Sequence, residues 1–148
     1  MNIHTTDVVI IHFFRKVSVP LARWGLFIIF FWFGVLKVIG LSPASGLVER
    51  LFETTIPWVP FATFLIGFGL FEMLIGVLFL FRGTERIVIP LLFIHMITTF
   101  IPLFLLPQET WSGFLTPTLE GQYIIKNFAL IATAIGIASH LHPLPYKK

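Results

Sequence analysis

Cysteine is absent from the 148 residues of the chain. Its absence excludes disulfide bonds, thiolate nucleophiles, iron–sulfur clusters and thiolate metal sites within the chain itself. Any redox role would therefore need a bound cofactor or a partner protein.

Charged residues are scarce as well, at 11% of the chain, against about 25% in a soluble domain. Hydrophobic residues make up 57% and include 18 Phe. So few charges cannot cover a surface that faces water, so most of the chain must be surrounded by lipid. The basic residues are scattered and form no nucleic-acid-binding pattern, and we expect no nucleic-acid partner.

Long apolar runs dominate what is present. A spanning helix needs about 20 mostly apolar residues, and four stretches meet this requirement. They run approximately over Leu21–Gly40, Pro60–Phe81, Ile87–Leu106 and Tyr123–Leu141. The sequence therefore predicts an all-α membrane protein, a four-helix transmembrane bundle formed by residues 1–148 as a single domain.

The placement of Lys and Arg predicts the orientation of these spans. On one side of a four-span arrangement lie Arg15, Lys16, Arg23, Arg82, Arg86, Lys147 and Lys148. The opposite side carries Arg50 with four acids, namely Glu49, Glu53, Glu109 and Glu120. We therefore expect a multi-pass protein with both termini in the cytoplasm.

Short helices on the membrane surface are expected at two further places. Thr5 or Thr6 is suited to cap a short N-terminal helix that ends before span one. Ser42 is suited to cap a second helix on the outer side, with Pro43 at its first position. The outer loop from Gln108 to Glu120 is expected to fold back as a cap on the bundle.

Polar residues inside the spans share faces with small residues, which favour close helix packing in lipid. In span two, Glu72 lies between Gly69 and Gly76, and in span one Gly34 is three residues from Lys37. This spacing predicts that Gly34, Gly69 and Gly76 are helix-packing positions and that Lys37 and Glu72 face the interior.

Spans three and four follow the same pattern. His95 and Thr98 share one face of span three. In span four, Lys126 and Asn127 precede a stripe of small residues that includes Gly136. We predict a polar core or ligand site formed by Lys37, Glu72, His95, Thr98, Lys126 and Asn127, with Gly136 as a fourth packing position.

Two interpretations of this polar core stay open. An ionised side chain deep in a bilayer costs about 2.5–3.5 kcal/mol or more unless it is paired. Glu72 is therefore either part of an ion pair or hydrogen bond that holds the bundle, or a carboxylate that handles protons or binds a head group, with His95 as its partner. Lys37 and Lys126 are either anchors that reach the membrane surface or part of a site for an anionic or quinone-like ligand.

Elements of a self-sufficient active site are not visible in the sequence. It contains no recognisable nucleophile–base pair, phosphate-binding loop or metal-ligand spacing. We therefore expect no catalysis by the chain alone, no metal site and no intrinsic cofactor, with quinone or lipid as the candidate ligands.

Three segments resemble members of the DoxX-like integral membrane protein family. They are Phe31–Lys37 (FWFGVLK), Gly67–Phe81 (GFGLFEMLIGVLFLF) and Gly121–Asn127 (GQYIIKN). The likeness is greatest to the YkgB-type branch, which includes reactive-chlorine-resistance membrane proteins. It covers approximately residues 24–139, and the matching positions are Gly34, Lys37, Glu72, Gly76, Lys126 and Asn127.

This resemblance implies a four-helix protein of the bacterial inner membrane. Some members of the family are membrane subunits of a thiosulfate:quinone oxidoreductase, and others belong to oxidative-stress or thiol-redox assemblies. It therefore implies a membrane subunit or accessory protein of a redox-linked system, with other membrane subunits or further copies of the chain as partners. The alternatives are a small proton-coupled carrier that uses Glu72 and His95, and a quinone-reactive oxidoreductase subunit.

Overall fold

Residues 3–143 are described by the computed structural model of the chain, with side chains from residue 6 onward. Four helices of this part are long and apolar enough to cross a membrane. They are α1 (Ile3–Val38), α3 (Phe61–Leu80), α4 (Glu85–Phe100), which α5 (Pro102–Leu105) extends, and α7 (Leu119–Ala138). The prediction of an all-α, four-helix transmembrane bundle is confirmed, and the chain is a multi-pass membrane protein.

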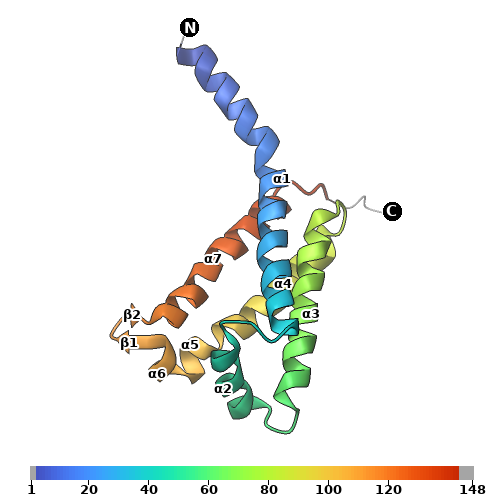
Figure 1. Ribbon diagram of the computed structural model, residues 1–148. Coiled ribbons are helices and arrows are strands. Elements are labelled where there is room, and N and C mark those ends of the chain that lie inside the picture. The colour runs from blue at the N-terminus through green and yellow to red at the C-terminus, as the bar shows by residue number, and fades with distance from the viewer. Residues whose placement is uncertain (1–2, 144–148) are drawn as a thin grey trace.

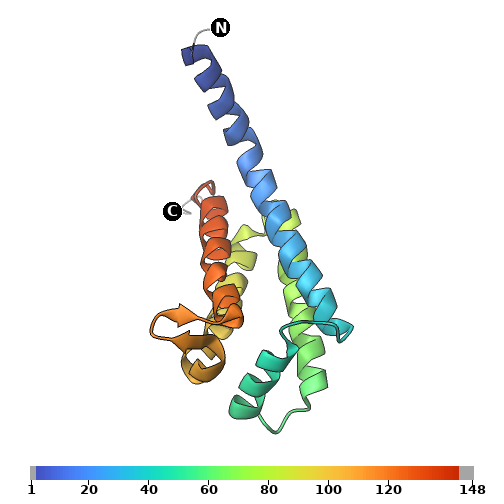
Figure 2. The same cartoon turned by 60° about the vertical axis from the view of Figure 1, so that its left-hand side comes forward.

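Figures 1 and 2 show how these helices are arranged. The turn between α3 and α4 lies at the same end of the bundle as the C-terminal end of α7, and α1 approaches from that end. The opposite end carries α2 (Ser45–Thr55), α5, α6 (Pro107–Thr110) and a small hairpin. The α1–α3 and α4–α7 connections therefore lie at one end of the bundle and the α3–α4 connection at the other, as expected for a chain that crosses a membrane four times.

The N-terminal segment differs from the prediction of a separate surface helix. It forms the first part of α1, which runs for 36 residues through Pro20, and Figure 1 shows this part extending away from the other helices. A proline inside a helix removes one main-chain hydrogen bond and its ring crowds the preceding turn, but membrane-spanning helices tolerate it. The helix therefore continues through Pro20, although span one was predicted to begin at Leu21.

The outer helix α2 exists, but its predicted start at Ser42 and Pro43 was wrong. It begins at Ser45, with Ala44 at the N-cap position and no capping hydrogen bond from a side chain. The helix is fastened instead by packing and charge: Phe52 is buried near Phe64, and Arg50 forms an ion pair with Glu109.

The outer loop folds into α6 and a two-stranded hairpin, β1 (Trp111–Gly113) and β2 (Thr116–Pro117). The strands were not predicted from the sequence. The indole Nε1 of Trp111 donates to the carbonyl of Leu103, which ties the hairpin to α5. Thr118 then caps α7 by accepting from the amide of Gly121, so that span four starts at Leu119, four residues before its predicted beginning.

The apolar core lies between α1, α3, α4 and α7. Its most buried members include Leu26, Ile75, Phe79, Leu92 and Ile137. Helices α1 and α3 form the closest pair, because glycines remove the side chains that would separate them. A Cβ built on Gly34 would lie 2.5 Å from the carbonyl oxygen of Gly69, and one on Gly76 would lie 2.8 Å from the amide nitrogen of Phe31.

Candidate functional site

The α1–α3 contact brings Lys37 and Glu72 together inside the bundle. The Nζ atom of Lys37 lies 2.6 Å from Oε2 of Glu72, and both residues are at least 94% buried. Gly69 makes this contact possible, since a Cβ at that position would lie 2.9 Å from the Cβ of Lys37. The long lysine side chain therefore points into the bundle and does not extend toward the membrane surface.

His95 of α4 completes the cluster from the other side of the carboxylate. Its Nε2 atom lies 3.3 Å from Oε1 of Glu72, and the ring is buried. The residues Lys37, Glu72 and His95, here called the ionic cluster, come from three different spans. Each oxygen of the carboxylate thus contacts a different helix, and the cluster joins α1, α3 and α4.

Hydrogen-bond geometry indicates which nitrogen of His95 carries the hydrogen. An ionised carboxylate only accepts hydrogen bonds, so the nitrogen that contacts Glu72 must be the donor. Thr99 supports this, because its hydroxyl donates to the main-chain carbonyl of His95 and its oxygen lies 3.5 Å from Nε2. The other nitrogen, Nδ1, is buried without a hydrogen-bond partner among the described side chains of residues 6–143.

Aromatic rings enclose the cluster. The ring of Phe68 lies 5.0 Å from that of His95, and the Nζ of Lys37 lies 5.6 Å from the same phenyl ring. Phe30 meets the imidazole edge-on at 5.4 Å, with Phe71 at 6.1 Å. These rings keep lipid and water away from the charges, which strengthens the attraction between Lys37 and Glu72. Sequence reasoning missed them, although Phe68 precedes Glu72 by one helical turn.

Not all of the predicted core residues meet at this cluster. Thr98 is exposed, and its hydroxyl donates to the carbonyl of His95 on its own helix, so that Thr99 and not Thr98 reaches the imidazole. Lys126 is exposed, with its Nζ 5.2 Å from the ring centre of Tyr123. Asn127 is half-buried. Neither residue of α7 makes a described hydrogen bond or ion pair with the ionic cluster.

Of the four glycines predicted to be packing positions, three lie in a helix contact and one does not. Gly34, Gly69 and Gly76 all lie in the α1–α3 contact. The prediction for Gly136 was wrong, because it is exposed and a Cβ built on it would meet no atom within 4 Å. The inward face of α7 carries Ala134 and Ile137 instead, so the helix is rotated away from its small-residue stripe.

A second ionic contact, which sequence reasoning missed, lies at the end of the bundle that carries the α3–α4 turn. Arg23 forms an ion pair with Glu85 and donates to the carbonyls of Phe79 and Phe81, at 3.1 and 3.0 Å. It therefore joins α1 to the end of α3 and the start of α4. The available signal was Glu85 itself, an acid placed between Arg82 and Arg86 on the basic side of the chain.

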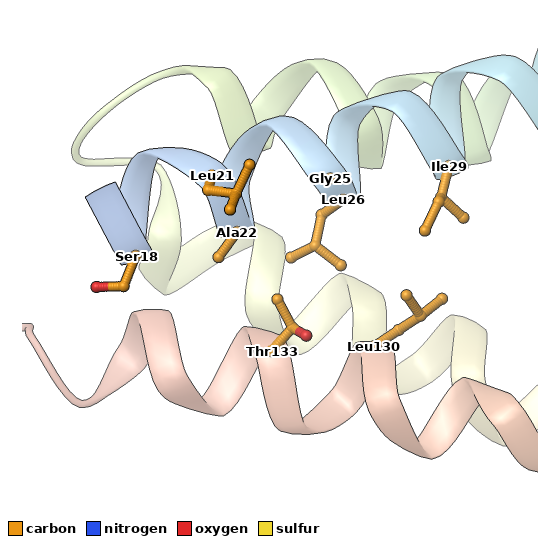
Figure 3. Close-up of a pocket in the computed structure, with 8 residues that line it drawn as sticks. All are labelled: Ser18, Leu21, Ala22, Gly25, Leu26, Ile29, Leu130 and Thr133. Carbon is orange, nitrogen blue, oxygen red and sulfur yellow. The ribbon is translucent and has the colours of Figure 1, made fainter. Parts of the chain in front are cut away.

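Two grooves border α1. The first, of about 350 Å³, lies between α1 and α7, and Figure 3 shows Leu26 and Ile29 of α1 pointing toward Leu130 and Thr133 of α7. The second, of about 590 Å³, contains Lys16, Arg23, Arg82 and His140. Neither groove is lined by a residue of the ionic cluster, which is enclosed by protein.

Metal binding by carboxylates and imidazoles needs several of them close together. Among the described side chains of residues 6–143, no three from His, Asp or Glu are grouped closely enough to hold a metal ion. The ionic cluster contributes only two groups of this kind, and the lysine ammonium occupies one oxygen of the carboxylate.

Comparisons of the chain with protein-family models, with curated proteins and with solved structures find no significant match.

Proposed function

We propose that the chain is a non-catalytic membrane subunit of a redox-linked system in the bacterial inner membrane. The observation that carries this proposal is the N-terminal part of α1. A helix of 36 residues is about 54 Å long, whereas the hydrocarbon core of a bilayer is only about 30 Å thick. About 16 residues of α1 therefore extend past the other spans.

This extension exposes several large apolar side chains. Val9, Phe13 and Phe14 are each about 60% exposed, and Ile10 and Ile11 are at least 40% exposed. Exposed apolar surface of this extent is typical of a surface that contacts another protein or a membrane. In the proposed function, this segment docks a partner subunit at the cytoplasmic face of the membrane.

The ionic cluster supports a structural role within this subunit. The charges of Lys37 and Glu72 neutralise each other. The Nζ atom of Lys37 contacts one carboxylate oxygen of Glu72, and His95 contacts the other. Such a cluster holds three spans at one angle and leaves no free nucleophile. The redox link of the proposal is supported by the resemblance of residues 31–37, 67–81 and 121–127 to DoxX-like proteins.

Purification in native lipids, followed by mass spectrometry of co-purifying proteins and quinones, tests the proposal. We expect an oxidoreductase subunit to co-purify with the unaltered chain. The amount of this subunit should be at least tenfold lower with Phe13→Ser/Phe14→Ser. Phe114→Ser is the matched control, because Phe114 is 94% exposed at the hairpin on the other side. A monomer without any enriched protein or quinone would contradict the proposal, as would identical partners for all three proteins.

A second candidate function is a small proton-coupled carrier, which is favoured by the unpartnered Nδ1 of His95. A neutral imidazole beside a carboxylate is able to accept a proton on this atom and pass its other hydrogen to Glu72. His95→Gln removes the titrating ring and leaves the Lys37–Glu72 pair in place. If proton flux into proteoliposomes is equal with and without this substitution, the carrier role is excluded.

A further inference from the structure

The basic groove, defined by Lys16, Arg23, Arg82 and His140, lies at the end of the bundle where the basic residues gather. Its walls come from three parts of the chain that are far apart in sequence: α1, the end of α3 with the following turn, and the turn that follows α7. The space they enclose is about 590 Å³. Four groups that carry or accept positive charge thus converge on one cavity.

The charge in this groove is not balanced by the residues around it. No acidic residue lines the groove, and Glu85, which contacts Arg23 of the groove, is already paired with it. Lys16 and Arg82 are exposed and form no ion pair with the side chains that the structure describes, those of residues 6–143. Two full positive charges therefore remain available to an anion.

Arg23 supplies a donor that is already oriented. Its side chain is 12% exposed, and its guanidinium donates to the carbonyls of Phe79 and Phe81 and to the carboxylate of Glu85. Those three hydrogen bonds use three of the five N–H groups of a guanidinium. The side chain is thus fixed before a ligand binds, which lowers the entropy that binding costs.

His140 adds a group with a defined free nitrogen. Its Nδ1 lies 2.9 Å from the carbonyl oxygen of Gly136, which only accepts hydrogen bonds, so Nδ1 carries a hydrogen. Nε2 is left for a ligand, as an acceptor in the neutral ring and as a donor once the ring is protonated.

The position of the groove indicates where its ligand comes from. Leu80, the last residue of α3, and Trp24, which is 54% exposed, also line it. Tryptophan and the ends of spans mark the level of lipid head groups, and cations on the cytoplasmic side attract anionic lipids. We propose that the basic groove binds the phosphate head group of an anionic phospholipid from the surrounding leaflet.

The test compares lipids that share acyl chains but differ in head-group charge. Native mass spectrometry of the full chain in detergent is performed with added phosphatidylglycerol or phosphatidylcholine, in the unaltered protein and in Lys16→Gln and Arg82→Gln. We expect phosphatidylglycerol to bind more tightly, and each substitution to weaken its binding about fivefold, the effect of one cation at a membrane surface.

Arg15→Gln is the matched control. Arg15 is an exposed cation beside Lys16 on α1 but does not line the groove. The proposal requires that its loss leave phosphatidylglycerol binding within twofold of the unaltered chain. An equal loss from all three substitutions would show diffuse attraction without a site and would overturn the proposal, as would equal binding of the two lipids. Displacement of the lipid by millimolar inorganic phosphate would identify a soluble anion as the ligand and would overturn it too.

Discussion

At the scale of single residues, the cost of burying charge explains the most distinctive feature of the chain. Lys37 and Glu72 are each at least 94% buried, whereas the pair formed by Arg50 and Glu109 has exposed side-chain surface of 58% and 30%. The first pair cannot recover solvation if it is broken, because aromatic rings and helices surround it. If the second pair is broken, each of its charged groups can form hydrogen bonds with water instead.

We therefore expect Glu72→Gln to destabilise the protein by about 3–5 kcal/mol, since it leaves the ammonium of Lys37 buried without a counter-charge. Glu109→Gln, at the exposed pair, should cost about 1 kcal/mol or less. Unfolding by a denaturing detergent, followed by circular dichroism in lipid–detergent micelles, measures both values. Equal effects would show that the Lys37–Glu72 pair is not enclosed as described.

Removal of both charges provides a second check on the same pair. In Lys37→Met/Glu72→Leu no unpaired charge remains, and apolar groups of similar size fill the space. This double substitution should be more stable than Glu72→Gln alone, because replacing a buried ion pair by apolar groups is often close to neutral. A loss as large as that of the single substitution would assign the effect to shape and not to charge.

At the scale of elements, the distance between α1 and α3 depends on glycine. Gly34 and Gly69 face each other, so that a Cβ on either residue would overlap the main-chain carbonyl of the other. Helices pack so closely in lipid mainly where small residues meet, because no hydrophobic driving force holds helices together there. This close approach also places Lys37 within reach of Glu72.

Gly34→Ala should therefore destabilise the protein by about 1–3 kcal/mol, the usual cost of overpacking a close contact. Gly67→Ala is the matched control on α3, since a Cβ at that position would meet no atom within 4 Å. We expect the control to be neutral or to stabilise by up to about 1 kcal/mol through helix propensity. The same denaturation experiment compares them, and a neutral Gly34→Ala would refute the close α1–α3 contact.

At the scale of the whole molecule, the two ends of the bundle differ in charge and in structure. The end with α2, α6 and the hairpin carries Glu109 and Arg50, and the other end carries Arg23, Arg82 and the basic groove. The excess of Lys and Arg at one end predicts that this end faces the cytoplasm.

The absence of cysteine makes the orientation directly testable. In an otherwise cysteine-free chain, Phe114→Cys at the hairpin should react with a membrane-impermeant maleimide from outside intact spheroplasts. Arg82→Cys, in the α3–α4 turn, should react only after the membrane is opened. Labelling of Arg82→Cys in intact spheroplasts, with Phe114→Cys protected, would show that the chain is inserted the other way round.

The sequence-based predictions were accurate for features that depend on neighbouring residues and less accurate for features that depend on contacts between distant ones. Each span was recognisable because its hydrophobicity is a local property of about 20 residues, and the helix ends differ from the predictions by a few residues where caps such as Thr118 decide them. The continuity of α1 through Pro20 was not predictable, because no local signal tells a tolerated proline from a terminating one.

The amino-acid sequence by itself determined that lipid surrounds most of this protein, how many times the chain crosses the membrane and which types of side chain are able to meet inside the bundle. All three follow from composition and from hydropathy along the chain. Only the tertiary structure decided which polar residues meet. Lys37, Glu72 and His95 come together across three helices, while Lys126 and Gly136 are exposed. The physical reason is that the rotation of each helix about its axis depends on packing between residues far apart in sequence, and α7 turns Ala134 and Ile137 inward instead of its small-residue stripe.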